Sequence, residues 1–276
     1  MKKIVIFVIL CLLLTFVSCD SQVTNPTTTP TKTPVKTVAP TATPTKTPVK
    51  TVAPTTTPTK TPVKTAAPTS PPKSEQIVPS NLAVGNIVKF GFYEQDNDLP
   101  NGKEDIEWLV LDVKNGKALI ISKYGLDCQP YHTTYANVTW ETCTLRNWLN
   151  TTFYMTAFDA KQQSIIASTA LMNEDNSFFG AEGGNDTTDK VFLLSSSETN
   201  RYFKLDTERK LIATAYSKAQ GASVVQGGSI WWLRSPGDDG RNAAIVDYSG
   251  SADDYGAGVF ADDYTVRPAL WINLES

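Results

Sequence analysis

The pattern of apolar and polar positions divides the chain into an apolar start, a long polar tract and a region of short apolar segments. In the last region, residues 87–93 alternate between apolar and polar, and residues 108–113 and 118–124 are two apolar runs. These runs flank Asn115-Gly116, the dipeptide that favours a type I′ turn because both central residues need positive φ. We therefore predict a strand over 87–93 followed by a β-hairpin.

The middle of this region has helical spacing instead. Apolar residues recur every three or four positions over 145–153, after a cap at Thr142 or Thr144, and this predicts a helix. A second short helix is expected after Asp159, with Ile165 and Ile166 facing inward.

Strands return towards the C-terminus. Residues 191–194 read as a buried strand, and Ser195 with Glu198 offers a capping box for a helix ending near Phe203. Further strands are expected at 230–234, 243–248, 258–261 and 266–274, with turns at Ser249-Gly250 and Tyr255-Gly256. The predicted fold class is α+β, with two to three short helices on a small, twisted, mostly antiparallel sheet.

The apolar start predicts export. Lys2 and Lys3 precede an apolar run over 4–17, which is shorter than a usual membrane span. The run ends at Ser18-Cys19, which resembles the lipobox of bacterial lipoproteins. The resemblance implies a signal peptide over 1–18, a diacylglycerol on the Cys19 thiol, and anchorage at the extracellular face of the cell membrane. The alternative is an ordinary secretory signal with an incidental cysteine.

Residues 19–76 form a repeat. The sequence TPTKTPVKTVAPT starts at Thr29 and Thr43, and again at Thr57 with Ala66 in place of Val. This composition cannot bury a core, and its prolines favour an extended chain that would reach about 170 Å. We expect a disordered, lipid-anchored linker that holds a globular domain, residues 77–276, away from the membrane.

Charge differs between these parts. Residues 1–74 contain nine Lys and one acid, whereas the remainder contains 16 basic and 27 acidic residues. The basic linker suits an anionic membrane surface or wall polymers. The acidic domain argues against nucleic acid as a partner.

Residues 238–264 have the composition of a binding surface. The block holds seven Asp and three Tyr but no Lys, Glu, Gln, Met or Trp, five types that fill 33 of the 200 positions over 77–276. Tyrosine supplies contact area at low entropic cost, and short polar residues adapt to a ligand. The ligand-binding candidates are Asp238, Asp239, Arg241, Asn242, Asp247, Tyr248, Asp253, Asp254, Tyr255, Phe260, Asp262, Asp263 and Tyr264.

The block also contains three acid pairs. Asp238-Asp239, Asp253-Asp254 and Asp262-Asp263 would bind calcium if they converged, or else they form a solvated acidic rim. No EF-hand loop is present, and adjacent strand residues point to opposite faces. We expect no cofactor. Calcium is the one metal for which these pairs are candidate ligands.

Other candidates for chemistry are few. His132 is the only histidine, and no zinc, nucleophile-elbow or CxxC motif occurs. Cys128 and Cys143 would close a loop worth about 3 kcal/mol as a disulfide, or they remain two buried free thiols. Arg234 and Arg267 flank the acidic block, and we expect each to pair with an acid or a backbone carbonyl and stabilise the surrounding strands.

Several motifs resemble an uncharacterised domain family that is common in secreted proteins of gut clostridia. They lie at 106–112, 142–146 and 188–194, and continue through WWLRSPG (231–237) and VRPALWINL (266–274). The closing layout, a Trp-rich strand, a polar meander and an Arg-containing last strand, is similar to C-type-lectin-like domains. Formylglycine-generating enzymes and the variable proteins of diversity-generating retroelements share that fold.

These observations lead to one expected function and two alternatives. The first is a cell-surface lipoprotein whose lectin-type domain binds a protein or a glycan, with a binding surface at 238–264 that is diversified at the codon level. The alternatives are a wall-associated enzyme related to formylglycine-generating enzymes, which would use Cys128 or Cys143, and a structural cell-envelope component. Adenine-directed mutagenesis requires NNC codons at the variable positions, including Asp247, Tyr248 and 253–255.

Overall fold

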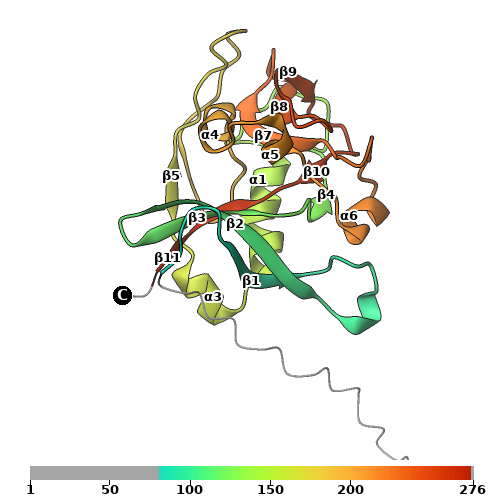
Figure 1. Ribbon diagram of the computed structural model, residues 1–276. Coiled ribbons are helices and arrows are strands. Elements are labelled where there is room, and N and C mark those ends of the chain that lie inside the picture. The colour runs from blue at the N-terminus through green and yellow to red at the C-terminus, as the bar shows by residue number, and fades with distance from the viewer. Residues whose placement is uncertain (1–80, 275–276) are drawn as a thin grey trace, which may run out of the picture. The chain divides into compact units, whose positions relative to one another are not determined.

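The computed structural model describes residues 81–274 (Figure 1). The predicted signal peptide, the lipidation site Cys19 and the Thr/Pro repeats lie outside the described residues. None of the helices in the described part is both long and apolar enough to span a membrane. The strands are β1 (Ile87–Tyr93), β2 (Glu104–Lys114), β3 (Lys117–Ser122), β4 (Asp127–Cys128), β5 (Thr169–Leu171), β6 (Thr187–Asp189), β7 (Trp231–Pro236), β8 (Asn242–Val246), β9 (Ala252–Gly258), β10 (Thr265–Val266) and β11 (Ala269–Asn273).

These strands form two main sheets and a small ribbon. One sheet has the order β1-β2-β3-β11, the second has the order β4-β10-β7-β8-β9, and β5 pairs with β6. All strand pairs among the described residues are antiparallel except β7 with β10. The α+β class and the β2–β3 hairpin are confirmed, with φ of 51° at Asn115 and 69° at Gly116.

The helices are shorter and more numerous than the two or three that we predicted. They are a 3-10 turn (Leu99–Asn101), α1 (Thr144–Trp148), a π-helical turn (Leu149–Phe153), α2 (Tyr154–Ala157), α3 (Ala160–Ile165), α4 (Ser196–Tyr202), α5 (Asp206–Arg209) and α6 (Ala215–Ala219). The predicted capping box forms at Ser195, and the helix expected after Asp159 also begins with a capping box, in which Asp159 pairs with Gln162. The predicted cap of α1 was wrong, because the Sγ of Cys143 accepts the hydrogen bond from the Arg146 amide at 3.4 Å.

The last predicted strand, 266–274, is in fact two strands. It breaks at Arg267-Pro268, so that β10 pairs in the five-stranded sheet and β11 pairs in the four-stranded sheet (Figure 1). Proline has no amide hydrogen for a sheet ladder, and this suits it to the junction between two sheets. The VRPALW segment therefore connects the two sheets through the centre of the domain.

Three further predictions for the C-terminal half differ from the structure. A strand was expected at 258–261, but the strand in this part of the chain is β9, which lies earlier, at Ala252–Gly258. The turn expected at Tyr255-Gly256 is a bulge within that strand: Gly256 has φ +78°, and a Cβ there would lie 2.3 Å from the Ala243 carbonyl oxygen. Residues 191–194 are buried as expected, but they do not form the predicted strand. They have a single β-bridge, between Phe192 and Ala269.

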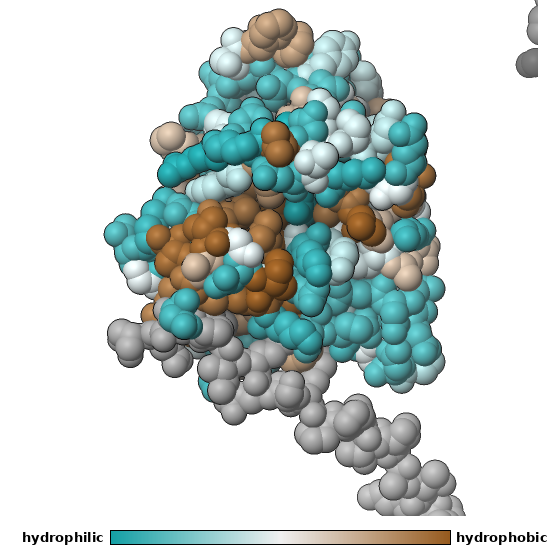
Figure 2. All heavy atoms as spheres, in the orientation of Figure 1, coloured by the Kyte–Doolittle hydropathy of each residue, from teal (hydrophilic) through white to brown (hydrophobic). Residues whose placement is uncertain are grey.

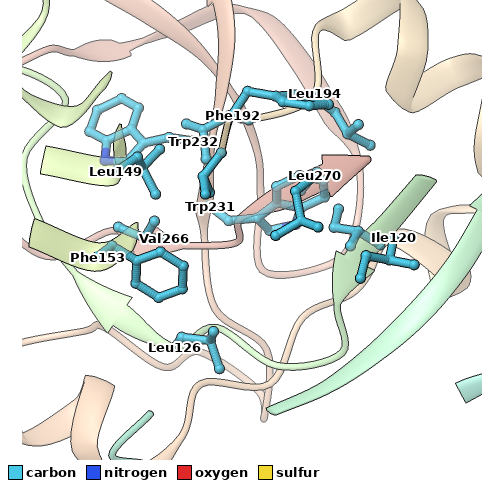
Figure 3. Packing of buried hydrophobic residues seen from close by; sticks show 14 of the residues in the cluster. Ile120, Leu126, Leu149, Phe153, Phe192, Leu194, Trp231, Trp232, Val266 and Leu270 are labelled. Atoms are coloured by element: carbon cyan, nitrogen blue, oxygen red, sulfur yellow. The ribbon is translucent and has the colours of Figure 1, made fainter. Parts of the chain in front are cut away.

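One hydrophobic core lies between the sheets and the helical segments. Figure 3 shows side chains from both halves of the chain packed together around Trp231. Leu149 and Phe153 come from the π-helical turn, Trp231 comes from β7 and Leu270 comes from β11. The aromatic residues with helical or strand spacing are therefore core residues.

The four-stranded sheet is less completely covered. Ile87 pairs with Leu109, and Leu109 pairs with Ile121, so the three side chains share one face of the sheet. Ile87 is 45% exposed and Leu109 is half-buried, and Figure 2 shows hydrophobic side chains gathered over this sheet.

Candidate ligand-binding surface

The most unusual surface feature is a group of exposed aromatic side chains brought together from three segments of the chain. We define the aromatic surface as Tyr135, Phe178, Phe179, Tyr255 and Phe260. Each of these residues is between 40% and 82% exposed. Isolated exposed apolar residues are ordinary, whereas a group in mutual contact marks an interaction site.

One half of the aromatic surface centres on Tyr135. Its ring makes an edge-to-face contact with Phe260, with centroids 5.2 Å apart. The guanidinium of Arg241 lies 5.5 Å from the centre of the Tyr135 ring and also pairs with the Asp239 carboxylate. The contacts hold two exposed rings and an ion pair in one arrangement, so less entropy is lost when a ligand binds.

The other half is formed by two consecutive phenylalanines and a tyrosine. Phe178 contacts Phe179 with ring centroids 4.7 Å apart, and Phe179 contacts Tyr255 at 5.6 Å, both edge to face. Tyr255 lies on β9, the edge strand of its sheet, next to the Gly256 bulge. The bulge therefore positions a ring that a regular strand would direct differently.

Asp238 connects the two halves. Its backbone amide donates to the Tyr255 carbonyl oxygen at 2.9 Å, and its carboxylate accepts a hydrogen bond from the Asn242 side chain. The negative charge of Asp238, together with a hydrogen bond to that carboxylate, raises the pKa of Tyr255. The same charge also favours the protonated form of Arg241, whose pKa is raised mainly by Asp239.

Asn176 fixes the Phe178-Phe179 segment to the sheet. Its side chain is buried, and its Nδ2 donates to the carbonyl oxygens of Pro236, Gly237 and Asp254 at 2.8–3.1 Å. Its Oδ1 accepts from the amides of both phenylalanines at 3.0 and 3.1 Å. One buried amide thus holds two exposed rings beside β9.

Close backbone packing at Gly237 supports the same arrangement. A Cβ at this position would lie 2.6 Å from the Tyr255 carbonyl oxygen and 2.7 Å from the Asn242 Cβ. A side chain at Gly237 would therefore push β9 away from the turn that carries the acids.

The Tyr135 loop is tied to the same segment at two points. The Val138 amide donates to the Gly240 carbonyl oxygen, and the His132 amide donates to the Val259 carbonyl oxygen, both at 2.7 Å. His132, the only histidine, also accepts from the Thr144 amide through Nδ1 at 3.2 Å. This hydrogen bond gives His132 a structural role at the N-terminus of α1.

Several predicted site residues lie elsewhere. Tyr248 and Asp247 are at the turn between β8 and β9, five residues or about 17 Å along the strand from Asn242. Partial burial would raise the pKa of Asp247, but hydrogen bonds from Ser249 and Ser251 outweigh it and lower the pKa. Asp247 therefore stabilises the turn.

The remaining acids serve separate purposes. Asp253 and Asp254 are exposed on the edge strand β9, where charge discourages pairing with another strand. The backbone carbonyl oxygens of Asp262 and Asp263 accept hydrogen bonds from Cys128 and from Ser223.

Tyr264 belongs to the core side of the segment. Its ring packs on buried Trp232 with centroids 4.8 Å apart, and the side chain is half-buried. Its predicted role in ligand binding stays a prediction, with part of the side chain accessible to a ligand.

The three predicted acid pairs do not converge on a calcium site. Within residues 81–274, one group of three acidic side chains has the spacing to hold a metal, and it consists of Glu94, Asp96 and Glu104. The acid pairs are separated because they lie on a turn, an edge strand and a loop of the same meander.

Of the two alternatives for Cys128 and Cys143, the disulfide was wrong and the pair of buried free thiols is confirmed. The Cys128 thiol donates to the Asp262 carbonyl oxygen at 3.1 Å, whereas Cys143 caps α1 and packs in the main core. Burial raises the pKa of each thiol to about 12, assisted at Cys128 by the charges of nearby Asp127, Asp263 and Asp262.

The high pKa values lead to a prediction about thiol reactivity. At pH 8, only about one in ten thousand of these thiols is ionised, and the thiolate is the reactive form. We expect iodoacetamide to label Cys128 and Cys143 at least ~100-fold more slowly in the folded protein than in urea, as measured by peptide mass spectrometry. Recovery of a disulfide-linked peptide pair from the native protein would contradict this arrangement.

The two arginines that flank the acidic block stabilise the surrounding strands as predicted. Arg234 pairs with Glu198 and donates to the Leu193 carbonyl oxygen at 3.1 Å. Arg267 donates to the carbonyl oxygens of Ser122 and Arg209 at 3.1 and 3.2 Å. Burial lowers the pKa of Arg267 to about 9, so its guanidinium is still charged at neutral pH.

The sequence predicted two of the five rings of the aromatic surface and three of the charged residues beside it. Tyr255, Phe260, Asp238, Asp239 and Arg241 were predicted site residues. Tyr135, Phe178, Phe179 and Asn176 were missed because they are 40 or more residues away in the chain. The exposed Phe178-Phe179 dipeptide in a polar, glycine-containing segment was the signal that was available.

The described residues thus define a mixed α+β domain with mostly antiparallel, curled sheets and a rigid, aromatic, acidic surface at one end. The chain belongs to the family DUF6273, a domain of unknown function, whose model matches residues 115–274. No match was found among curated proteins or among solved structures.

Proposed function

We propose that this domain is the ligand-binding part of a lipoprotein, anchored at the extracellular face of the cell membrane through Cys19 and displayed on the linker of residues 19–76. The observation that carries the proposal is the aromatic surface, in which five exposed rings lie in two contacting groups and buried Asn176 holds Phe178 and Phe179 beside β9. Exposed aromatic side chains cost solubility, and rigid rings bind at low entropic cost. Five exposed rings in two contacting groups therefore favour binding over a structural role.

The chemistry of the surface indicates the class of ligand. Asp238, Asp239, Asp253 and Asp254 surround the rings, with Arg241 as the nearby cation. Negative charge next to aromatic faces favours a cationic partner through electrostatic and cation–π attraction, and paired carboxylates accept hydrogen bonds from hydroxyl groups. We therefore propose a basic protein segment or a glycan as the ligand.

A triple substitution tests this proposal. Phe179→Ala, Tyr255→Ala and Phe260→Ala together remove exposed rings from both halves of the surface, and we expect at least ~100-fold weaker binding to any ligand found on a glycan or protein array. The matched control is Met155→Ala, Leu205→Ala and Ile212→Ala, which removes three exposed apolar side chains elsewhere on the domain.

The control variant should bind as the unmodified protein does, and both variants should unfold at nearly the same temperature. Tyr264 is left in place because its loss would disturb the packing around Trp232. Equal binding by the triple variant and the unmodified protein would exclude the aromatic surface as the binding site.

We further propose a C-type-lectin-like fold and a diversified surface related to the variable proteins of retroelements. The side chains of Asp253, Asp254 and Tyr255 are exposed and have room to vary, whereas Gly256 and buried Val259 are fixed by close packing. Diversification therefore predicts NNC codons at the exposed positions and a reverse transcriptase gene nearby. Codons of other types at these positions in the gene would end this part of the proposal.

The two alternatives receive less support. An enzyme related to formylglycine-generating enzymes needs a reactive cysteine, and the two described cysteines are buried with pKa values near 12. A structural envelope component gives no reason for rings held apart from the core. Activity that is lost on Cys128→Ser or Cys143→Ser with the fold intact would favour the enzyme.

A further inference from the structure

A second site lies in the loop between β1 and β2, far from the aromatic surface. In Figure 1 this loop is at the opposite end of the domain from β8 and β9. Its sequence, EQDNDLPNGKE over 94–104, holds four acids and one lysine. The Nζ of Lys103 donates to the Thr156 carbonyl oxygen at 2.6 Å, so the only cation of the loop is engaged on α2.

Three of the acids converge. One carboxylate oxygen from each of Glu94, Asp96 and Glu104 lies within 4.8 Å of the other two. Glu94 is only 7% exposed, and its Oε1 is shielded from solvent without a hydrogen-bond partner. A buried carboxylate oxygen that lacks a donor is costly unless a cation neutralises it.

The neighbouring groups hold the other two carboxylates in place. Asp96 accepts from the Asp98 amide at 2.8 Å and from the Asn101 side chain at 2.9 Å. Glu104 accepts from the Gln95 amide at 2.6 Å. The three carboxylates are thus positioned by the loop itself, in spite of their mutual repulsion.

The three carboxylates bring like charges together at one place in the loop. A cation among them would compensate the buried carboxylate of Glu94 and offset the repulsion between the three groups.

The spacing suits calcium. Oxygen ligands surround Ca²⁺ at about 2.4 Å, so that two ligands on opposite sides of the ion are about 4.8 Å apart. Carboxylates bind this ion through one or both oxygens, and water completes the six to eight positions. We propose that the β1–β2 loop binds one calcium ion through Glu94, Asp96 and Glu104.

Binding at this site would order one edge of the domain. The loop contacts α6 through the Tyr216 amide, which donates to the Gln95 carbonyl oxygen at 3.0 Å. A bound ion would therefore fix the β1–β2 loop against α6 and stabilise the fold, independently of any ligand on the aromatic surface.

Calcium titration of the full-length protein tests the proposal. We expect one ion per chain by isothermal titration calorimetry, and a rise in the unfolding temperature of about 3–6 °C from EDTA to ~10 mM calcium, with a smaller rise in magnesium. Glu94→Gln and Glu104→Gln should each weaken binding at least ~10-fold. Asp253→Asn with Asp254→Asn, a matched loss of charge on β9, should leave binding unchanged.

Two results would overturn this site. One is a folded wild-type protein that shows neither binding heat nor a thermal shift at ~10 mM calcium. The other is calcium binding that survives both glutamate substitutions or is lost in the β9 control, since the ion would then lie elsewhere.

Discussion

Replacing Trp231 with alanine should lower the free energy of unfolding by about 3–5 kcal/mol, the usual cost of removing a fully buried tryptophan. Trp231 is 0% exposed, and its ring lies at the centre of the core in Figure 3. Its Nε1 donates to the Arg209 carbonyl oxygen at 3.2 Å, and the Arg267 guanidinium lies 4.8 Å from the ring centre. The substitution therefore leaves a cavity, removes one of the two hydrogen bonds to the Arg209 carbonyl oxygen, and leaves the buried Arg267 guanidinium with Phe203 as its remaining aromatic contact.

Urea unfolding followed by far-UV circular dichroism measures this loss without relying on tryptophan fluorescence. Trp231→Phe is the matched control, because it keeps an aromatic face for Arg267 while losing the hydrogen bond and part of the volume, and we expect about half the effect. Phe260→Ala, at a 52% exposed ring, should change stability by less than about 0.5 kcal/mol. A loss below about 1 kcal/mol for Trp231→Ala would contradict the central place of this residue.

Replacing Asp189 with alanine should cost a similar amount, about 3–5 kcal/mol, for an electrostatic reason. The side chain is 1% exposed and accepts from Trp140 Nε1 at 2.9 Å, from Thr187 Oγ1 at 3.0 Å and from Arg146 Nε at 2.7 Å. Its removal leaves a buried indole N–H without an acceptor and a mostly buried guanidinium without its carboxylate. Asp189 thereby links β6, α1 and the loop that precedes α1.

Asp189→Asn keeps one acceptor oxygen but loses the charge. In the same urea measurement we expect its unfolding free energy to lie between those of the unmodified protein and Asp189→Ala. A double-mutant cycle with Arg146→Met separates the ion pair from the other hydrogen bonds. The loss of unfolding free energy in the double variant should be clearly smaller than the sum of the losses in the two single variants. Each single variant leaves one buried charge without its partner, whereas the double variant removes both charges. Additive losses would show that Asp189 and Arg146 do not interact in solution.

The local elements of this fold were predictable because neighbouring residues specify them. Asn115-Gly116 forms its turn because both residues accept positive φ, and Asp159 and Ser195 cap their helices through side-chain oxygens three residues from the amides that they bind. The interactions involve four consecutive residues, so the sequence alone contains the whole motif.

Elements that depend on distant partners were predicted less well. Residues 191–194 have the apolar run of a strand, yet they form a single β-bridge, between Phe192 and Ala269, and much of their remaining backbone bonds to Asn150 and Arg234. The split of 266–274 at Pro268 follows from the position of two sheets, which no local pattern contains. The same holds for Gly256, whose bulge is set by the Ala243 carbonyl oxygen on the neighbouring strand.

The sequence by itself determined the class of the fold, the β2–β3 hairpin, the capping box at Ser195, and the block where Tyr255 and Phe260 lie. Only the tertiary structure decided which residues share a surface: it joined Tyr135 and Phe178 to that block, placed Tyr264 against the core, and brought Glu94 to Glu104. The physical reason is that composition and periodicity report on contacts between near neighbours. A binding surface depends on which distant segments the core packs side by side, and hydrogen bonds such as those of Asn176 then hold them there.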